Sequence, residues 1–205
     1  MSAVFVRRGG SDERIPCEAV VNTLPINEAA RMIAPSLGPE AEEAAKRLRF
    51  RATVFVGIKA ARKRVLPASF MYFREHSFNR VTDLSHFGHK IEPEGTTLLV
   101  AEVNCDPGDR LWNDEAHVLE SVSADLEREG VLRRSEILET HVFRSRHAYP
   151  IYTLGYEKDL AILLESLGRL RNLETAGRQG RFQYVNTHVA MKMGYEAADR
   201  LRARI

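Results

Sequence analysis

Apolar and polar residues alternate in the middle of the chain. From Phe50 to Ile58 every second residue is apolar, and this period of two predicts a strand with one strongly apolar face. Residues 96–104 are rich in Thr, Leu and Val and predict another strand. Weaker extended segments complete this region, at residues 69–73, 80–82 and 137–146, with Pro150 ending the last of them.

Helical patterns, with apolar residues three or four positions apart, surround and interrupt this region. One helix is expected from Asn113, as its cap, to about Glu129, with Gly130 closing it. Leucines between residues 160 and 170 predict a helix with an apolar stripe wide enough to be buried against a sheet. Three further helices are expected, at residues 27–33 with Asn27 as cap, at residues 39–48, and at residues 186–201 with Asn186 as cap.

The two ends of the chain each pair short strands with helices. Residues 3–6 predict a strand that enters a glycine-rich turn, and residues 15–23 predict a second strand. The apolar run at residues 19–21 is typical of a strand buried on both faces. A short strand is also expected at residues 172–176. Together these patterns predict an α+β fold, with a mostly antiparallel sheet covered by a helix in the middle of the chain.

Composition and charge exclude several classes of protein. Of the 205 residues 44% are hydrophobic and 28% charged, which is typical of a globular protein. A net charge of only +2 argues against a nucleic-acid partner, and no apolar run is long enough to cross a membrane. Cys17 and Cys105 lie far apart, and the first ten residues have the wrong order for a secretory signal. These features predict a cytoplasmic protein.

The segment from Ala176 to Asn186 carries the most chemical information. Gly177 and Gly180 allow the backbone to approach a ligand closely, and Arg178 offers a planar fork suited to phosphate. The helix expected to follow would present unpaired N–H groups and a partial positive charge. The segment therefore indicates either an anion site or a surface loop with arginines before a helix.

Three segments together resemble a known family. Residues 176–186, followed by residues 193–198, resemble the closing flavin motif of the FAD-dependent amine oxidase superfamily. The resemblance is strongest to the branch that contains UDP-galactopyranose mutase and the protoporphyrinogen-oxidase-like proteins. Residues 19–25 resemble the strand that returns the family's chain to its FAD domain, and residues 147–156 resemble its alanine-tyrosine-proline segment.

The resemblance implies an assignment of domains. It makes residues 1–48 and 153–205 part of a Rossmann-type FAD-binding domain and residues 49–152 a substrate-binding domain. It also implies two sets of site residues, with no catalytic residue and no metal ligand identified. The implied cofactor-binding residues are Gly177, Arg178, Gln179, Gly180, Asn186 and Thr187. The residues implied or considered for the substrate side are Tyr149, Tyr152 and Tyr184, together with Arg144, for which an exposed strand face is the alternative.

The sequence departs from the family at several points. Asn186, Thr187 and His188 stand where members often carry an aspartate, and Glu18 replaces a usual aspartate. No G-x-G-x-x-G occurs, so the turn that holds the FAD pyrophosphate is missing. The chain could be a fragment of a longer protein, one of two separate chains, or a truncated relative that no longer binds FAD. We expect it to be inactive and not to retain FAD by itself.

Two functional hypotheses follow. The first is a flavoenzyme, oxidase-like or mutase-like, that acts on a small-molecule substrate and needs an amino-terminal FAD-binding half or a separate chain that carries it. The second is a non-catalytic binding or assembly module, because apolar strand edges such as Val20 and Val21 tend to pair with another chain. This second hypothesis predicts a homodimer or a complex with the missing half. A zinc site is also considered at His76, His86 and His89, but their spacing fits no standard motif.

Overall fold

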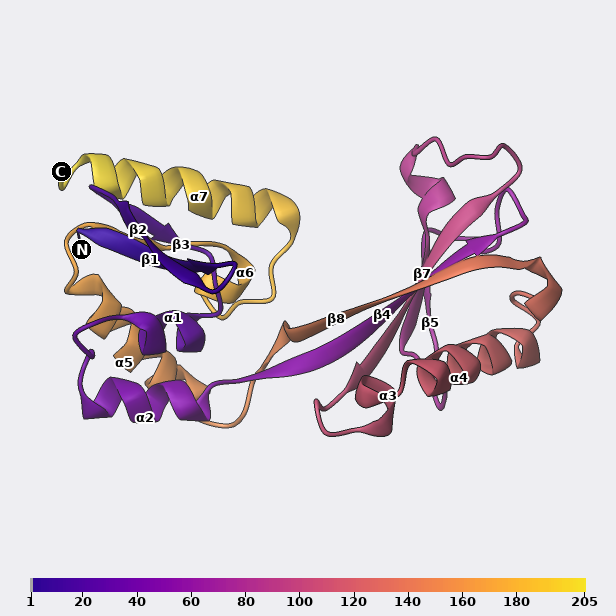
Figure 1. The fold of residues 1–205 in the computed structure, drawn as a ribbon, viewed down its shortest axis with the longest axis horizontal. Coiled ribbons are helices and arrows are strands. Elements are labelled where there is room, and N and C mark those ends of the chain that lie inside the picture. Colours follow the sequence, from indigo (N-terminus) through magenta and orange to yellow (C-terminus); the bar gives the residue numbers. More distant parts are fainter. Residues whose placement is uncertain (1) are drawn as a thin grey trace. The chain divides into compact units, whose positions relative to one another are not determined.

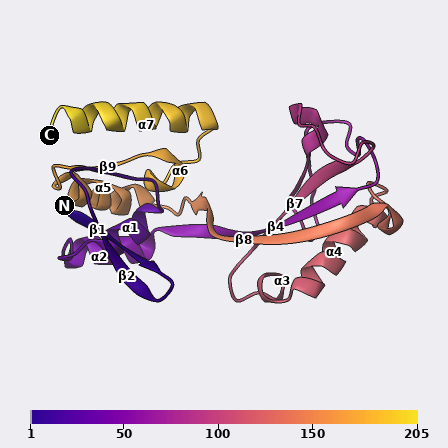
Figure 2. The ribbon, with the colours of Figure 1, turned by 45° about the horizontal axis from the view of Figure 1, so that its top comes forward.

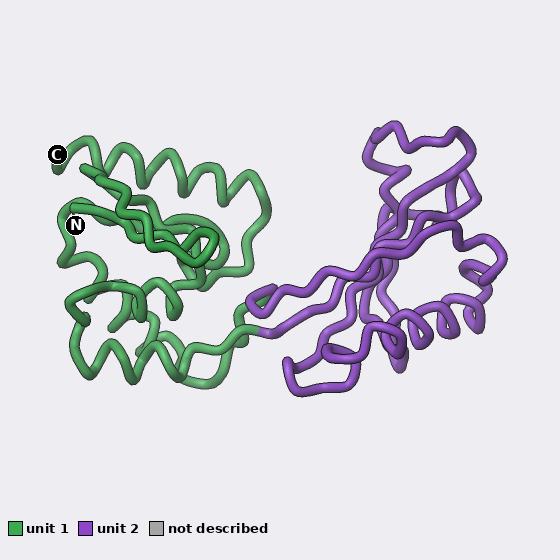
Figure 3. Tube along the Cα trace, in the orientation of Figure 1, with its two compact units in different colours: residues 1–50, 149–205 green, residues 51–148 purple. Residues whose placement is uncertain are grey.

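The computed structural model describes residues 2–205, which divide into two compact units (Figure 3). Unit 1 contains residues 2–50 and 149–205, and unit 2 contains residues 51–148. The prediction of an α+β fold with an antiparallel sheet is confirmed. Among the helices described, none is long and apolar enough to cross a membrane.

Unit 2 is built on a five-stranded antiparallel sheet (Figure 1). Its spatial order is β5-β6-β7-β4-β8. The strands are β4 (Arg49–Ala60), β5 (Phe70–Tyr72), β6 (Arg80–Asp83), β7 (Thr97–Cys105) and β8 (Ile137–Ile151). The predicted alternation places Val54, Val56 and Ile58 in the core with exposed fractions of 1% or less. Helix α4 (Glu115–Arg128) covers this core with Val118, Val122 and Leu126.

Two predicted boundaries of elements in or next to the five-stranded sheet are wrong. Asp114, not Asn113, caps α4, because its carboxylate accepts from the His117 N–H at 2.9 Å, and Asn113 ends the short helix α3 (Arg110–Asn113). Strand β8 also continues through Pro150 instead of stopping there. The strand lies at the edge of the sheet, where a residue without an N–H is tolerated. The remaining short elements are the 3₁₀ turns η1 (Leu84–Phe87) and η2 (Arg134–Glu136).

Unit 1 contains two small sheets and most of the helices (Figure 2). Strands β1 (Ala3–Arg8) and β2 (Ser11–Pro16) form an antiparallel hairpin, whereas β3 (Val20–Asn22) and β9 (Leu173–Thr175) pair in parallel. The helices are α1 (Ile26–Met32), α2 (Pro39–Arg47), α5 (Tyr156–Gly168), α6 (Gly177–Gly180) and α7 (Thr187–Arg202). Apolar residues of α1, α2, α5 and β9 share one core with Phe182.

The structure also corrects three expectations in unit 1. The strand predicted at residues 15–23 is two strands, and Val21 is 42% exposed, so β3 is not buried on both faces. Asn27 does not cap α1; it lies inside the helix, and its buried amide donates to the Leu48 carbonyl at 3.1 Å. The leucine stripe of α5 packs against helices α1 and α2 as well as β9, rather than against a broad sheet.

Candidate functional site

The glycine-arginine segment follows directly on the parallel pair of strands. The Val20 N–H donates to the Asn172 carbonyl and the Ala176 N–H to the Asn22 carbonyl, both at 2.9 Å. The chain then turns at Gly177, whose φ of +78° is a conformation that glycine adopts without strain. A Cβ atom placed on Gly177 would have no atom within 4 Å. The backbone here therefore borders open space that a ligand could occupy.

Gly180 has a different role. It ends α6 and lies against the backbone of Asn22 and Thr23 at the end of β3, where a Cβ atom would not fit. The second predicted ligand-approaching glycine is thus explained by packing between two segments of unit 1. Gln179 lies beside it in α6, half-buried, and its carbonyl accepts from the Phe182 N–H at 3.2 Å.

Arg178 contacts two of the predicted substrate-side tyrosines. Its guanidinium carbon lies 4.0 Å from the ring centroid of Tyr184 and 4.8 Å from that of Tyr149, which is cation–π geometry. The Nε atom is buried and has no hydrogen-bond partner within residues 2–205. The two rings therefore hold the arginine in place and leave one of its donors unused.

The third predicted tyrosine joins the same group. The Tyr152 hydroxyl accepts from the Tyr184 N–H at 2.8 Å. The Tyr152 ring lies 4.8 Å from the ring of Tyr156 and 5.9 Å from that of Phe182, measured between centroids. We call these residues the aromatic cluster: Tyr149, Tyr152, Tyr156, Phe182 and Tyr184. Segments far apart in the sequence thus bring together Arg178 and three of the four residues predicted for the substrate side.

Two members of the aromatic cluster were not predicted from the sequence. Phe182 is fully buried, makes an edge contact with Phe50 at 4.9 Å, and has a φ of +50°, which is uncommon for a bulky residue. Tyr156 opens α5, and burial raises the pKa of its phenol, with the negative charge of Glu157 adding to the effect. The spacing of Tyr149, Tyr152 and Tyr156 was the available signal, whereas nothing in the sequence indicates the backbone conformation of Phe182.

The predicted residues at the start of α7 are exposed. Asn186 occupies the cap position, but its side chain makes no capping hydrogen bond, contrary to the expectation. Its carbonyl instead accepts from the N–H groups of Val189 and Ala190, at 3.0 and 3.1 Å. Thr187 is the first residue of the helix. The positive end of this 16-residue helix is therefore open to a ligand.

Arg144 lies in unit 2 and has partners there. Its Nε donates to the Trp112 carbonyl at 2.8 Å, and its Nη1 lies 3.3 Å from a Glu115 carboxylate oxygen. These contacts tie β8 to α3 and to the start of α4. A role in substrate binding stays a prediction for this residue.

Metal ligands do not cluster in the part of the chain that is described. No group of three His, Cys, Asp or Glu side chains there could hold an ion. His76, one of the three histidines considered for zinc, contacts the rings of Phe73 and Phe78 and pairs with Glu129 at 2.8 Å. Its ring therefore packs against aromatic side chains of unit 2.

Comparison with known proteins identifies the fold. No protein-family model and no curated protein sequence matches the chain significantly. Among solved structures, reduced UDP-galactopyranose mutase matches 95% of this chain and 43% of its own, with a TM-score of 0.78 and 20% identity. A protein assigned as a protoporphyrinogen oxidase from Exiguobacterium sp. 255-15 matches 98% of this chain and 44% of its own, with a TM-score of 0.67 and 16% identity. Putrescine oxidase bound to putrescine matches 99% and 46%, with a TM-score of 0.62 and 18% identity.

These matches confirm the predicted resemblance at the level of fold. The chain has the fold of one portion of these proteins, and it spans less than half the length of each of them. The two members that the sequence motifs singled out, the mutase and the protoporphyrinogen-oxidase-like proteins, are both among the structures found.

Proposed function

We propose that this chain is the portion of an FAD-dependent flavoenzyme that supplies its substrate domain and its last flavin-contacting segment. The observation that carries the proposal is the match to UDP-galactopyranose mutase, which covers 95% of the chain at a TM-score of 0.78. Unit 2 would then be the substrate-binding domain. Unit 1 would contribute the ends of a Rossmann-type FAD domain, since its parallel strand pair is followed by a glycine turn and a helix.

The residues present fit one side of a bound nucleotide. Gly177 offers open backbone, and the exposed start of α7 at Asn186 and Thr187 offers N–H groups and a partial positive charge. Arg178, which contacts the rings of Tyr149 and Tyr184, retains a buried Nε donor without a hydrogen-bond partner in the described chain. No G-x-G-x-x-G is available in the sequence to hold the pyrophosphate from the other side. The fit is therefore that of a partial site.

The bound flavin would supply the reactive group, either as a hydride acceptor or as a nucleophile towards a sugar. This chain would orient the substrate. Tyr149 and Tyr184, held by Arg178, offer aromatic faces and hydroxyls at one place in unit 1. The Tyr152 hydroxyl fixes the backbone at Tyr184 and so positions that ring.

The outer edge of β9 would take the strand that the complementary half supplies. Backbone groups of alternate residues along this strand point towards β3, namely those of Asn172, Glu174 and Ala176. The N–H and carbonyl of Thr175, between two of them, therefore point away from β3. A cavity of about 430 Å³ is lined by residues of β9, α5 and α7. Parallel sheets of only two strands need further cover, because parallel strands are normally buried. These features support a partner that adds a strand beside β9.

A second candidate function is an assembly module without catalysis. It is favoured by apolar side chains that unit 1 leaves in solvent: Phe5 is 70% exposed, Leu24 51% and Met32 65%. Exposed apolar groups of this kind mark protein interaction surfaces. A homodimer would cover them without any flavin.

Flavin binding distinguishes the two candidates. The purified chain is mixed with FAD, alone and together with a polypeptide that carries a G-x-G-x-x-G nucleotide-binding half, and the absorbance of the retained flavin is measured after desalting. Retention by the chain alone, or only in the mixture, supports the flavoenzyme portion. A colourless protein under both conditions contradicts it and favours the assembly module.

A further inference from the structure

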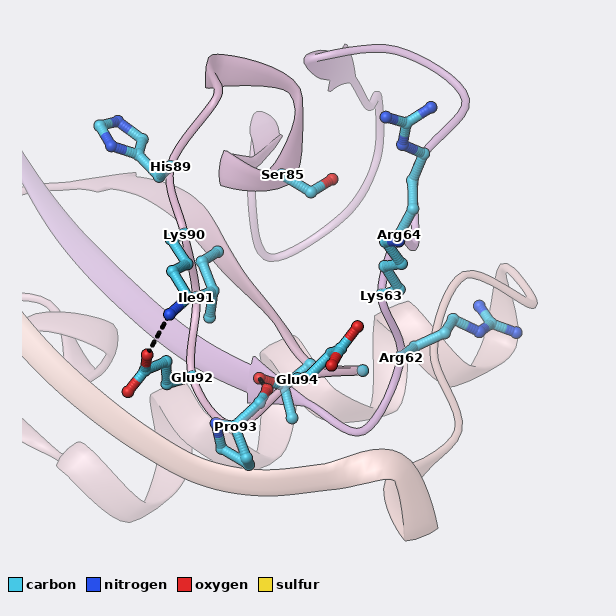
Figure 4. A pocket seen from close by; sticks show the side chains of 12 residues that line it. Arg62, Lys63, Arg64, Ser85, His89, Lys90, Ile91, Glu92, Pro93 and Glu94 are labelled. Carbon is cyan, nitrogen blue, oxygen red and sulfur yellow. Dashed lines mark hydrogen bonds and ion pairs between the residues drawn. The ribbon is translucent and has the colours of Figure 1, made fainter.

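We propose that a cavity in unit 2 binds a small ligand that carries a phosphate group. The cavity has a volume of about 990 Å³ and lies between the loop after β4 and the loop between η1 and β7 (Figure 4). It lies entirely within unit 2 and contains none of the predicted flavin-site residues. The proposal is therefore independent of the function proposed above.

The charges around the cavity favour an anion. Its lining includes four arginine and lysine side chains, Arg62, Lys63, Arg64 and Lys90, and two carboxylates, Glu92 and Glu94. Arg62 is paired with Glu136 at 3.4 Å, and Lys90 with Glu92 at 2.9 Å. Lys63 and Arg64 have no acidic partner within residues 2–205. Two unpaired cations suit a doubly charged phosphate better than a single carboxylate.

Ser85 supplies an unused hydrogen-bonding group in the same cavity. Its Oγ atom is buried and, within the described chain, has no hydrogen-bond partner. Figure 4 shows this side chain between the Arg62–Arg64 segment on one side and His89 and Lys90 on the other. A buried hydroxyl without a partner is unfavourable, and an oxygen of a bound phosphate would remove that cost by accepting from it.

Asp83 joins the two walls of the cavity. Its buried carboxylate accepts from the Val65 and Leu66 N–H groups, at 2.8 and 3.0 Å, on one side. On the other side it accepts from the Ser85 N–H at 3.0 Å and from the Thr97 hydroxyl at 2.8 Å. The four donors neutralise its charge locally and fix the loops, so that little ordering is needed when a ligand binds.

Calorimetric titration at constant ionic strength tests the proposal. The probes are inorganic phosphate and glycerol 3-phosphate, with glycerol and acetate as comparisons. We expect both phosphates to bind and both comparisons to fail. Tighter binding of glycerol 3-phosphate would identify an organic phosphate as the ligand, and equal binding would identify free phosphate. Acetate binding as tightly as phosphate would overturn the assignment, as would no phosphate binding at millimolar concentration.

Three variants locate the binding. The double change Lys63→Gln with Arg64→Gln should weaken phosphate binding at least about tenfold, since each removes a charged donor. Ser85→Ala should weaken binding severalfold while leaving the melting temperature unchanged or raised, because it deletes an unsatisfied hydroxyl. Arg74→Gln removes an exposed charge from unit 2 outside the cavity and is the matched control. Equal loss in this control would mean non-specific attraction and would refute the site.

Discussion

The backbone of Gly180 lies directly against the carbonyl group of Asn22. A Cβ atom at position 180 would come within 2.8 Å of the Asn22 oxygen and 3.5 Å of the Thr23 Cα atom. That oxygen already accepts the Ala176 N–H at 2.9 Å, so it cannot move without breaking the strand pair. Close approach of α6 to the end of β3 therefore depends on the missing side chain.

Gly180→Ala should destabilise the chain by about 1–3 kcal/mol, the usual cost of an added methyl group where packing is tight. Unfolding in urea, followed by far-UV circular dichroism, measures the change. Gly194→Ala is the control, because Gly194 lies inside α7 with no atom within 4 Å of a Cβ and should gain up to about 1 kcal/mol. Equal stability of the two variants would contradict the packing argument.

The contact between Arg178 and Tyr184 should contribute a measurable coupling. In a double-mutant cycle with Arg178→Met and Tyr184→Leu, we expect a coupling free energy of about 0.5–2 kcal/mol, the range for cation–π pairs. A second cycle with Tyr184→Phe removes only the hydroxyl, so its coupling free energy should be close to zero. A coupling in the phenylalanine cycle as large as in the leucine cycle would assign the interaction to the hydroxyl instead of the ring face. Thermal unfolding of the chain provides the free energies.

Much of the fold could be predicted because its strongest signals are local. The alternation in β4 follows from its side-chain period, and the start of helix α2 follows from Pro39 in its first turn. The boundaries of elements were predicted wrongly where contacts with other parts of the fold determine them. Pro150 remains within β8 because that strand lies at the edge of the sheet. Asn27 lies inside α1, where its amide donates to the carbonyl of Leu48, which is distant in sequence.

The types of residue at the candidate site could be predicted from the sequence, but their arrangement in space could not. Arg178 and the tyrosines at 149, 152 and 184 stand out by type and by family resemblance. That the arginine contacts two of these rings depends on the course of β8 and on the positive φ of Phe182, which no local pattern encodes. Gly177 and Gly180 look alike in sequence, yet one borders open space and the other a carbonyl group.

Pairing of a complementary strand with β9 should be blocked by Thr175→Pro. This change removes an N–H that points away from β3, so the pairing with β3 should survive, as proline does at the outer side of an edge strand. We expect the isolated chain to keep its circular dichroism spectrum but to lose flavin retention in the mixture with a nucleotide-binding half. Thr175→Val is the control, since it keeps the backbone donor and removes only the hydroxyl that accepts from Arg181. Flavin retention by the proline variant would exclude β9 as the docking edge while leaving flavin binding itself intact.

Stability of unit 2 should depend on pH through Asp83. Burial alone would raise the pKa of this carboxyl, but hydrogen bonds from the Val65, Leu66 and Ser85 N–H groups and from the Thr97 hydroxyl outweigh it and lower the pKa from 3.8 to about 2. A lowered pKa in the folded state means stabilisation that is complete above pH 3.8 and is lost as the pH falls towards 2. The difference in pKa corresponds to about 2 kcal/mol.

Comparison of the native chain with Asp83→Asn isolates this contribution. At pH 7 the variant should lose about 2–4 kcal/mol, because an amide offers one oxygen to four donors. The difference between the two proteins should shrink by about 2 kcal/mol between pH 5 and pH 2, since other carboxylates titrate equally in both. Fluorescence of Trp112, the single tryptophan and a core residue of unit 2, follows the unfolding. Glu94→Gln, an exposed acid in the same unit, should show no such convergence. A difference that stays constant with pH would mean that Asp83 acts only through its shape and not through its charge.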